Sequence, residues 1–189
     1  MRKLHGRIFV FLDRDGVINR KSPEGKYVQR WEDFHLLPGV EKAIADLNKA
    51  GCRIIVVTNQ RGVALGKYSH TDVETIHENL QKHLAKQGSH IDAFYYCPHD
   101  SGQCHCRKPA PGLILQAFRD FPDANANNSI MIGDSLSDIE AAHRVNMPAI
   151  FIEGPPELQK PGAHQARTEA DATFPSLAAA IQSLLDDTP

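Results

Sequence analysis

Short apolar segments alternate with amphipathic segments along most of the chain. The apolar segments, rich in β-branched and aromatic residues, are IFVFLD (8–13), RIIVVT (53–58), DAFYYC (92–97), SIMIGD (129–134) and PAIFIE (148–153). Each predicts a buried strand, because the apolar residues are continuous rather than alternating. Strands in strict alternation with helices predict an α/β fold, a doubly wound, Rossmann-like parallel sheet with helices on both faces.

The segments between these strands carry apolar residues at helical spacing. The predicted helices are VEKAIADLNKAG (40–51), the stretch 73–84, PGLILQAFRDF (111–121), SLSDIEAAHRVN (135–146) and a closing LAAAIQSLL (177–185). Residues 154–170, rich in Pro, Gly and Gln, predict a loop. A chain of 189 residues without internal repeats or long linkers is expected to form a single domain, 1–189.

Composition argues against two kinds of partner. A net charge of -2 and 7% aromatic residues give no basic surface or stacking platform for nucleic acid. The apolar run that begins at Ile8 stops at Asp13, too short for a signal peptide or a membrane span. We therefore expect a cytoplasmic protein with neither nucleic acid nor membrane as a partner, and we expect it to be a monomer.

Polar residues, with two glycines among them, follow the predicted strands where the strands end, which is the edge at which doubly wound sheets bind ligands. These residues are Asp13, Asp15 and Gly16 after the first strand, Thr58, Asn59 and Gln60 at the second, Gly133 and Asp134 at the fourth, and Lys108 before a helix. Taken singly, each is an ordinary turn, strand end, helix cap or surface charge. Carboxylates that face one another repel unless a cation lies between them. The set therefore predicts a site for a hard divalent cation such as Mg²⁺.

A second segment, CPHDSGQCHCRKP (97–109), holds three of the four cysteines. The fourth, Cys52, starts an apolar run and is expected to be buried. Disulfides are rare in reducing compartments, and exposed reduced thiols oxidise readily. Cys-x-His followed by Cys-x-Cys is the Cys₃His ligand set of structural zinc sites, which predicts Zn²⁺ bound in a loop at 97–106 by Cys97, His99, Cys104 and Cys106. The metal would fix Arg107 and Lys108 on a rigid base.

The order DRDGV, VVTN, a lone lysine and GDSLSD resembles the four motifs of the haloacid dehalogenase superfamily, specifically its phosphatases. The resemblance implies that Asp13 attacks phosphorus and that Asp15 is the general acid and base. Two carboxylates suit this chemistry, because an acyl phosphate splits one hard displacement into two easier ones. No bulky cap domain is visible between the motifs, so we expect a minimal cap and an open site.

The same resemblance implies how the phosphoryl group and the metal are held. Thr58 and Lys108 donate to the phosphoryl oxygens, where negative charge must be neutralised. The implied Mg²⁺ ligands are Asp13, the backbone carbonyl of Asp15, and Asp134. Asp138 is expected to support this set of ligands rather than to join it.

The zinc loop narrows the resemblance to the branch that contains heptose 1,7-bisphosphate 7-phosphatases and histidinol-phosphate phosphatases. FLDRDGVIN, KYVQRWEDFHLLPGV and VVTNQRGVALGKYS are similar to the bacterial heptose enzymes, over roughly residues 8–153. This implies a small phosphorylated sugar as the substrate. The four residues between His99 and Cys104 are nearer the loop length of the histidinol enzymes, so that substrate remains the alternative.

A bisphosphate carries a second dianion away from the reacting one. Arg107, on the zinc loop, can bind phosphate with a bidentate fork and is the candidate for this contact. Asn59, Gln60 and Arg61 would complete the polar rim, as the TNQ segment does in the heptose enzymes.

Two other readings belong to different classes of protein. A phospho-receiver signalling domain also places Asp, Thr and Lys around Mg²⁺, but it carries its phosphorylated Asp on a middle strand. Here the Asp13–Asp15 pair ends the first predicted strand. A zinc-dependent nucleic-acid module or polynucleotide 3′-phosphatase would need the basic surface that the composition does not suggest. The order of the motifs and the composition therefore favour a small-molecule phosphatase.

Overall fold

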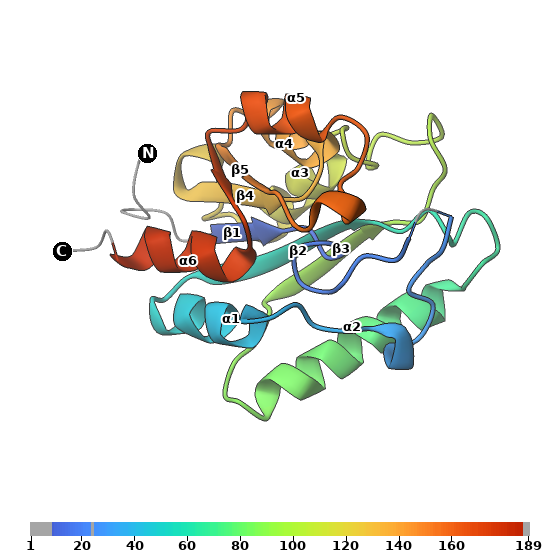
Figure 1. The fold of residues 1–189 in the computed structure, drawn as a ribbon, viewed down its shortest axis with the longest axis horizontal. Helices are drawn as coiled ribbons and strands as arrows, with labels where there is room; N and C mark the ends of the chain where they lie inside the picture. Colours follow the sequence, from blue (N-terminus) through green and yellow to red (C-terminus); the bar gives the residue numbers. More distant parts are fainter. Residues whose placement is uncertain (1–8, 24, 187–189) are drawn as a thin grey trace.

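Six parallel strands form one sheet in the order β3-β2-β1-β4-β5-β6 (Figure 1). The computed structural model describes residues 9–23 and 25–186. The strands are β1 (Phe9–Leu12), β2 (Arg53–Asn59), β3 (Ala93–Cys97), β4 (Ser129–Gly133), β5 (Ala149–Ile152) and β6 (Ala172–Phe174). The predicted α/β class, with a doubly wound parallel sheet, is confirmed.

Helices cover both faces of the sheet (Figure 1). On one face lie α1 (Val40–Lys49), α2 (His70–Ala85) and α6 (Leu177–Asp186), and on the other α3 (Gly112–Asp120), α4 (Leu136–His143) and α5 (Ala163–Glu169). Successive residues of β1 point to opposite faces, so that Val10 packs into the first core and Phe11 into the second. Among the described residues, no helix is both long and apolar enough to cross a membrane.

Local sequence signals account for the ends of several helices. Gly51 closes α1 with a φ of 76°, a conformation that L side chains rarely adopt. Ser69 and Asp72 form a reciprocal capping box at the start of α2. Cys52 is buried in the first core, as predicted.

After residue 153 the structure contains three elements that the sequence patterns did not predict. The predicted loop over 154–170 contains a short 3₁₀ turn (Pro156–Leu158) and α5, and β6 follows it at the edge of the sheet. Ala166 is the one fully buried residue of α5, so the helix has no apolar stripe for periodicity to detect. The predicted first strand began at residue 8, which lies outside the described residues.

The strand order fixes where a ligand can bind. β2 and β3 lie on one side of β1, and β4, β5 and β6 lie on the other. The direction of winding therefore reverses beside β1, which opens a crevice at the carboxyl ends of β1 and β4.

Candidate active site and zinc cluster

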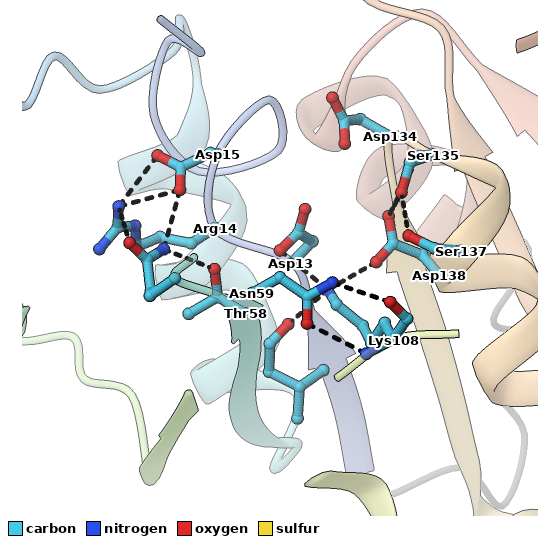
Figure 2. A network of polar contacts seen from close by, with 12 residues as sticks. Asp13, Arg14, Asp15, Thr58, Asn59, Lys108, Asp134, Ser135, Ser137 and Asp138 are labelled. Carbon is cyan, nitrogen blue, oxygen red and sulfur yellow. Dashed lines mark hydrogen bonds and ion pairs between the residues drawn. The ribbon is translucent and has the colours of Figure 1, made fainter. Parts of the chain in front are cut away.

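The carboxyl ends of three neighbouring strands bring the predicted catalytic residues together. Leu12, the last residue of β1, pairs with Val56 of β2 and with Ile132 of β4. β4 therefore ends one residue beyond β1, and β2 ends three residues beyond it. Asp13 and Asp134 follow β1 and β4 directly, and Thr58 is the second-last residue of β2, paired with Tyr96 of β3. Figure 2 shows their side chains in one crevice, with Asp13 at the centre.

Lys108 reaches this centre from the loop between β3 and α3. Its Nζ donates to Asp13 Oδ1 at 2.9 Å and to the Val57 carbonyl at 2.7 Å, and lies 2.5 Å from Asp138 Oδ1. Burial acts against the charge, but the carboxylates of Asp13 and Asp138 outweigh it and raise the pKa of Lys108. A fixed ammonium group is therefore present beside Asp13.

Asn59, at the end of β2, holds the backbone of Lys108. Its Nδ2 donates to the Lys108 carbonyl and its Oδ1 accepts from the Lys108 N–H, both at 3.0 Å. This two-point contact fixes where the lysine side chain begins. Both ends of the Asn59 amide are thus engaged by the backbone of Lys108, and the contact of Asn59 with the substrate stays a prediction.

Three carboxylates form the acidic centre: one oxygen each of Asp13, Asp134 and Asp138 lies within 4.8 Å of the others. Burial raises the pKa of Asp138; Lys108 lowers it, while the negative charge of Asp13 and Asp134 adds to the rise. Crowded carboxylates of this kind, with hard oxygen donors, fit magnesium. Asp138 also accepts from the Ser135 N–H at 3.1 Å and from Ser135 Oγ at 2.6 Å, as the third helical residue of the capping box in which Ser135 is the N-cap of α4.

Two lysines that sequence analysis missed contact Asp134. Lys21 Nζ donates to Oδ2 at 3.0 Å and Lys160 Nζ to Oδ1 at 2.7 Å, each from a loop. A lysine in a polar loop normally indicates a solvated charge, so the sequence contained no signal for these contacts. The same side of the site opens into a cavity of ≈ 760 Å³, lined by both loops and Asp134.

Gly16 is required by this arrangement. It has a φ of 102°, and a Cβ at this position would lie 2.2 Å from Asp134 Oδ2. The turn after β1 therefore passes directly against the carboxylate after β4, which explains the glycine that follows Asp15.

The Asp15 carboxylate lies on the opposite side of Asp13 from Asp134 (Figure 2). It accepts from Arg14 Nη2 at 3.1 and 2.9 Å, from Asn19 Nδ2 at 2.8 Å, and from Gln60 Nε2 at 3.0 Å. Burial opposes ionisation, but Arg14 and the hydrogen bonds from Asn19 and Gln60 hold the pKa of Asp15 below its usual value. The side chain is thus tied to the protein on both oxygens.

The other predicted rim residues differ in exposure. Gln60 is buried, donates to Thr58 Oγ1 at 2.9 Å and accepts from the Tyr68 hydroxyl at 2.7 Å. Arg61 is exposed and forms a two-point ion pair with Asp100, at 2.5 and 3.2 Å. Arg107 is half-buried and donates to the His99 carbonyl at 3.5 Å.

The cysteine loop gathers its four predicted ligands. One donor atom each of Cys97, His99, Cys104 and Cys106 lies within 4.8 Å of the others. Cys106 Sγ is 3.3 Å from Sγ of both other cysteines and 3.4 Å from His99 Nδ1. Sulfurs in a disulfide lie about 2.05 Å apart. Tetrahedral zinc with bonds of about 2.0–2.3 Å places its ligand atoms about 3.3–3.8 Å apart, so the cluster fits zinc.

The zinc cluster is built onto the sheet and α3. Cys97 is the last residue of β3 and pairs with Asn59 of β2. A Cβ on Gly112, the first residue of α3, would lie 2.3 Å from the His105 carbonyl, so the loop packs directly on the helix. Burial opposes ionisation of Cys104, but the Arg107 N–H and the neighbouring thiol of Cys106 lower its pKa to about 6, which favours the thiolate that binds metal.

Comparison with known proteins agrees with the arrangement of these residues. Residues 3–146 match the family profile of haloacid dehalogenase-like hydrolases. The chain belongs to this family. A haloacid dehalogenase-like hydrolase with these motifs is an enzyme, so the assignment to the hydrolases is confirmed and the receiver-domain reading is set aside.

Several relatives of this haloacid dehalogenase-like hydrolase are similar over most of their length. D-glycero-alpha-D-manno-heptose-1,7-bisphosphate 7-phosphatase of Mycobacterium bovis is 47% identical, over 89% of this chain and 86% of the relative. The D-glycero-beta-D-manno-heptose-1,7-bisphosphate 7-phosphatase of Escherichia coli K12 is 37% identical, over 93% and 92%. The D,D-heptose 1,7-bisphosphate phosphatase of B. bronchiseptica, complexed with magnesium and phosphate, superposes with a TM-score of 0.83 at 29% identity, covering 95% of this chain and 99% of that one.

Proposed function

We propose that this haloacid dehalogenase-like hydrolase removes the 7-phosphate of D-glycero-D-manno-heptose 1,7-bisphosphate, a step in making heptose precursors for lipopolysaccharide core or surface glycans. The observation that carries the proposal is the convergence of Asp13, Lys108 and Asp134 at the switch point of a chain so similar to heptose bisphosphatases. Residues 1–189 would act as one catalytic domain, as a cytoplasmic monomer.

The first half-reaction transfers the phosphoryl group to the protein. An Asp13 carboxylate oxygen forms a bond to phosphorus while the bond from phosphorus to the C7 oxygen breaks, and Asp15 gives that oxygen its proton. The products are heptose 1-phosphate and an aspartyl phosphate on Asp13. The negative charge of the arriving phosphate favours the protonated form of Asp15 that this step needs.

The second half-reaction restores Asp13. Water attacks phosphorus and passes a proton to Asp15, while the bond between phosphorus and the Asp13 oxygen breaks and inorganic phosphate leaves. Lys108 and Thr58 donate to phosphoryl oxygens throughout. Lys108 Nζ already has three acceptors, so the phosphoryl group takes the place of one of them as it binds. Asp13, Asp134 and the Asp15 carbonyl would hold Mg²⁺, which supplies neutralisation of phosphoryl charge when bound.

The substrate is tested by measuring phosphate release from both anomers of heptose 1,7-bisphosphate and from histidinol phosphate, side by side with Mg²⁺. We expect kcat/KM for the better heptose anomer to exceed that for histidinol phosphate by about 10- to 100-fold, the effect of one charge-assisted phosphate contact. A preference for histidinol phosphate would overturn the substrate and leave the phosphatase chemistry intact.

A variant of Arg107 tests the contact with the second phosphate. Arg107→Ala is expected to lower kcat/KM for the heptose bisphosphate by about 10- to 100-fold, and much less for a simple monophosphate ester that never used the contact. Arg119→Ala removes an exposed arginine of α3 and is the matched control, with both substrates unchanged. Equal losses on the two substrates would assign Arg107 to loop support.

A further inference from the structure

Arg14, between the two catalytic aspartates in the chain, is buried in the protein with 1% of its surface exposed. Its Nη2 donates to both oxygens of Asp15 and to Gln60 Oε1 at 3.2 Å. A buried guanidinium loses its hydration, so a site that keeps one must give it fixed partners. The chemistry described above gives Arg14 no part in binding phosphate or metal.

The partners of Arg14 are themselves held in place. Nη1 lies 3.5 Å from Nε2 of His77, whose ring stacks on Phe94 at 4.5 Å. Burial and the charge of Arg14 lower the pKa of His77 to about 3, so the imidazole is neutral and able to accept from the guanidinium. The Arg14 Cζ also lies 5.8 Å from the centre of the Phe34 ring. Contacts from α2 and the first loop thus fix the guanidinium.

Figure 2 shows the consequence for Asp15: its carboxylate contacts Arg14 on one side of Asp13, while Lys108 contacts Asp13 from another side. Gln60 Nε2 also donates to Asp15 Oδ2 at 3.0 Å. The contacts of Lys108 and Asp138 lie on the Asp13 side and include no atom of Arg14. The nucleophile and the acid–base carboxylate are therefore positioned by separate groups.

We propose that Arg14 is a positioning residue that orients the Asp15 carboxylate for proton transfer at the ester oxygen and does not assist attack by Asp13. The inference rests on the proposed function, because it takes Asp15 as the acid and base. Its consequence is a dependence on the leaving group. A sugar alkoxide is a strong base that must be protonated as it leaves, whereas p-nitrophenolate leaves without a proton.

The experiment compares kcat/KM for heptose 1,7-bisphosphate and for p-nitrophenyl phosphate in Arg14→Gln and Arg14→Lys. We expect Arg14→Gln to lose about 10²- to 10³-fold on the sugar ester and less than about tenfold on the aryl ester, within the range of general acid catalysis. Arg14→Lys retains the charge without the fork, so we expect it also to lose more on the sugar ester than on the aryl ester, with a smaller ratio between the two losses. Equal losses on both esters in either folded variant would overturn the proposal.

Arg53→Gln is the matched control. Arg53 also lies 5.8 Å from the centre of a phenylalanine ring, but it is the first residue of β2, at the end of the strand away from the site. Its kcat/KM for both esters should equal that of the wild type. Asp15→Asn separates the two levels of the argument. If Asp15→Asn discriminates between the esters and Arg14→Gln does not, the inference alone is wrong. If Asp15→Asn loses both esters equally, the acid–base assignment is wrong and the inference is overturned with it.

Discussion

Asp13→Asn is expected to lower kcat for phosphate release by about 10⁴-fold or more, the scale of losing a nucleophile. An amide neither attacks phosphorus nor binds Mg²⁺ as an anion. Asp13 is also a charge partner of Lys108 at 2.9 Å, so the substitution changes the electrostatics of the same centre. Turnover is measured as inorganic phosphate released from the heptose bisphosphate at saturating Mg²⁺.

The matched control is Asp46→Asn, which removes a carboxylate of α1 that pairs with the exposed Lys42 far from the crevice. Its kcat should equal that of the wild type. Both variants should keep their zinc, because neither residue touches the zinc cluster. A kcat for Asp13→Asn above roughly 1% of wild type would exclude Asp13 as the nucleophile.

Loss of zinc is expected to lower stability and activity together. The purified protein should contain about one equivalent of zinc, because the described residues include one Cys₃His set. Cys104→Ser should lose that zinc and lower the free energy of unfolding by about 3 kcal/mol or more, since structural zinc contributes folding energy outright. Phosphate release should also fall, because Lys108 is only two residues after the ligand Cys106 and its position depends on the cluster.

Cys52→Ala provides the control for removing a buried thiol outside the cluster. It should keep one equivalent of zinc and full turnover while losing some stability from its smaller side chain. Zinc is measured by metal analysis of the purified protein, and stability by denaturant unfolding. A Cys104→Ser protein that is free of zinc and yet as stable and active as wild type would contradict a structural zinc site.

The strands that could be predicted were those with long apolar runs. β1, β2, β4 and β5 are buried on both faces and show as continuous apolar segments. β3 was also predicted, but as a buried strand; it lies at the sheet edge, and its first four residues are half-buried. β6 has three half-buried residues at the sheet edge, and α5 is polar around most of its circumference. Because neither β6 nor α5 has a hydrophobic pattern of its own, neither could be predicted from the sequence.

The candidate site also contains residues whose positions could be predicted and residues whose positions could not. The aspartates after β1 and β4 could be predicted to converge because parallel strands end at one edge, and the zinc ligands were predicted from their spacing alone. The contacts of Lys21 and Lys160 with Asp134 depend on how two distant loops fold back over the sheet. The burial of Arg14 depends on packing against α2. Such long-range contacts leave no local pattern in the sequence.

The residues between His99 and Cys104 are anchored at both ends. On the N-terminal side, Cys97 pairs with Asn59 in the sheet. On the C-terminal side, the Asn59 side chain forms two hydrogen bonds with the backbone of Lys108. A chain fixed at its two ends can lengthen or shorten in the middle at a modest entropic cost. The length of this segment can therefore change while the position of Lys108, the proposed phosphate-binding lysine, stays constant.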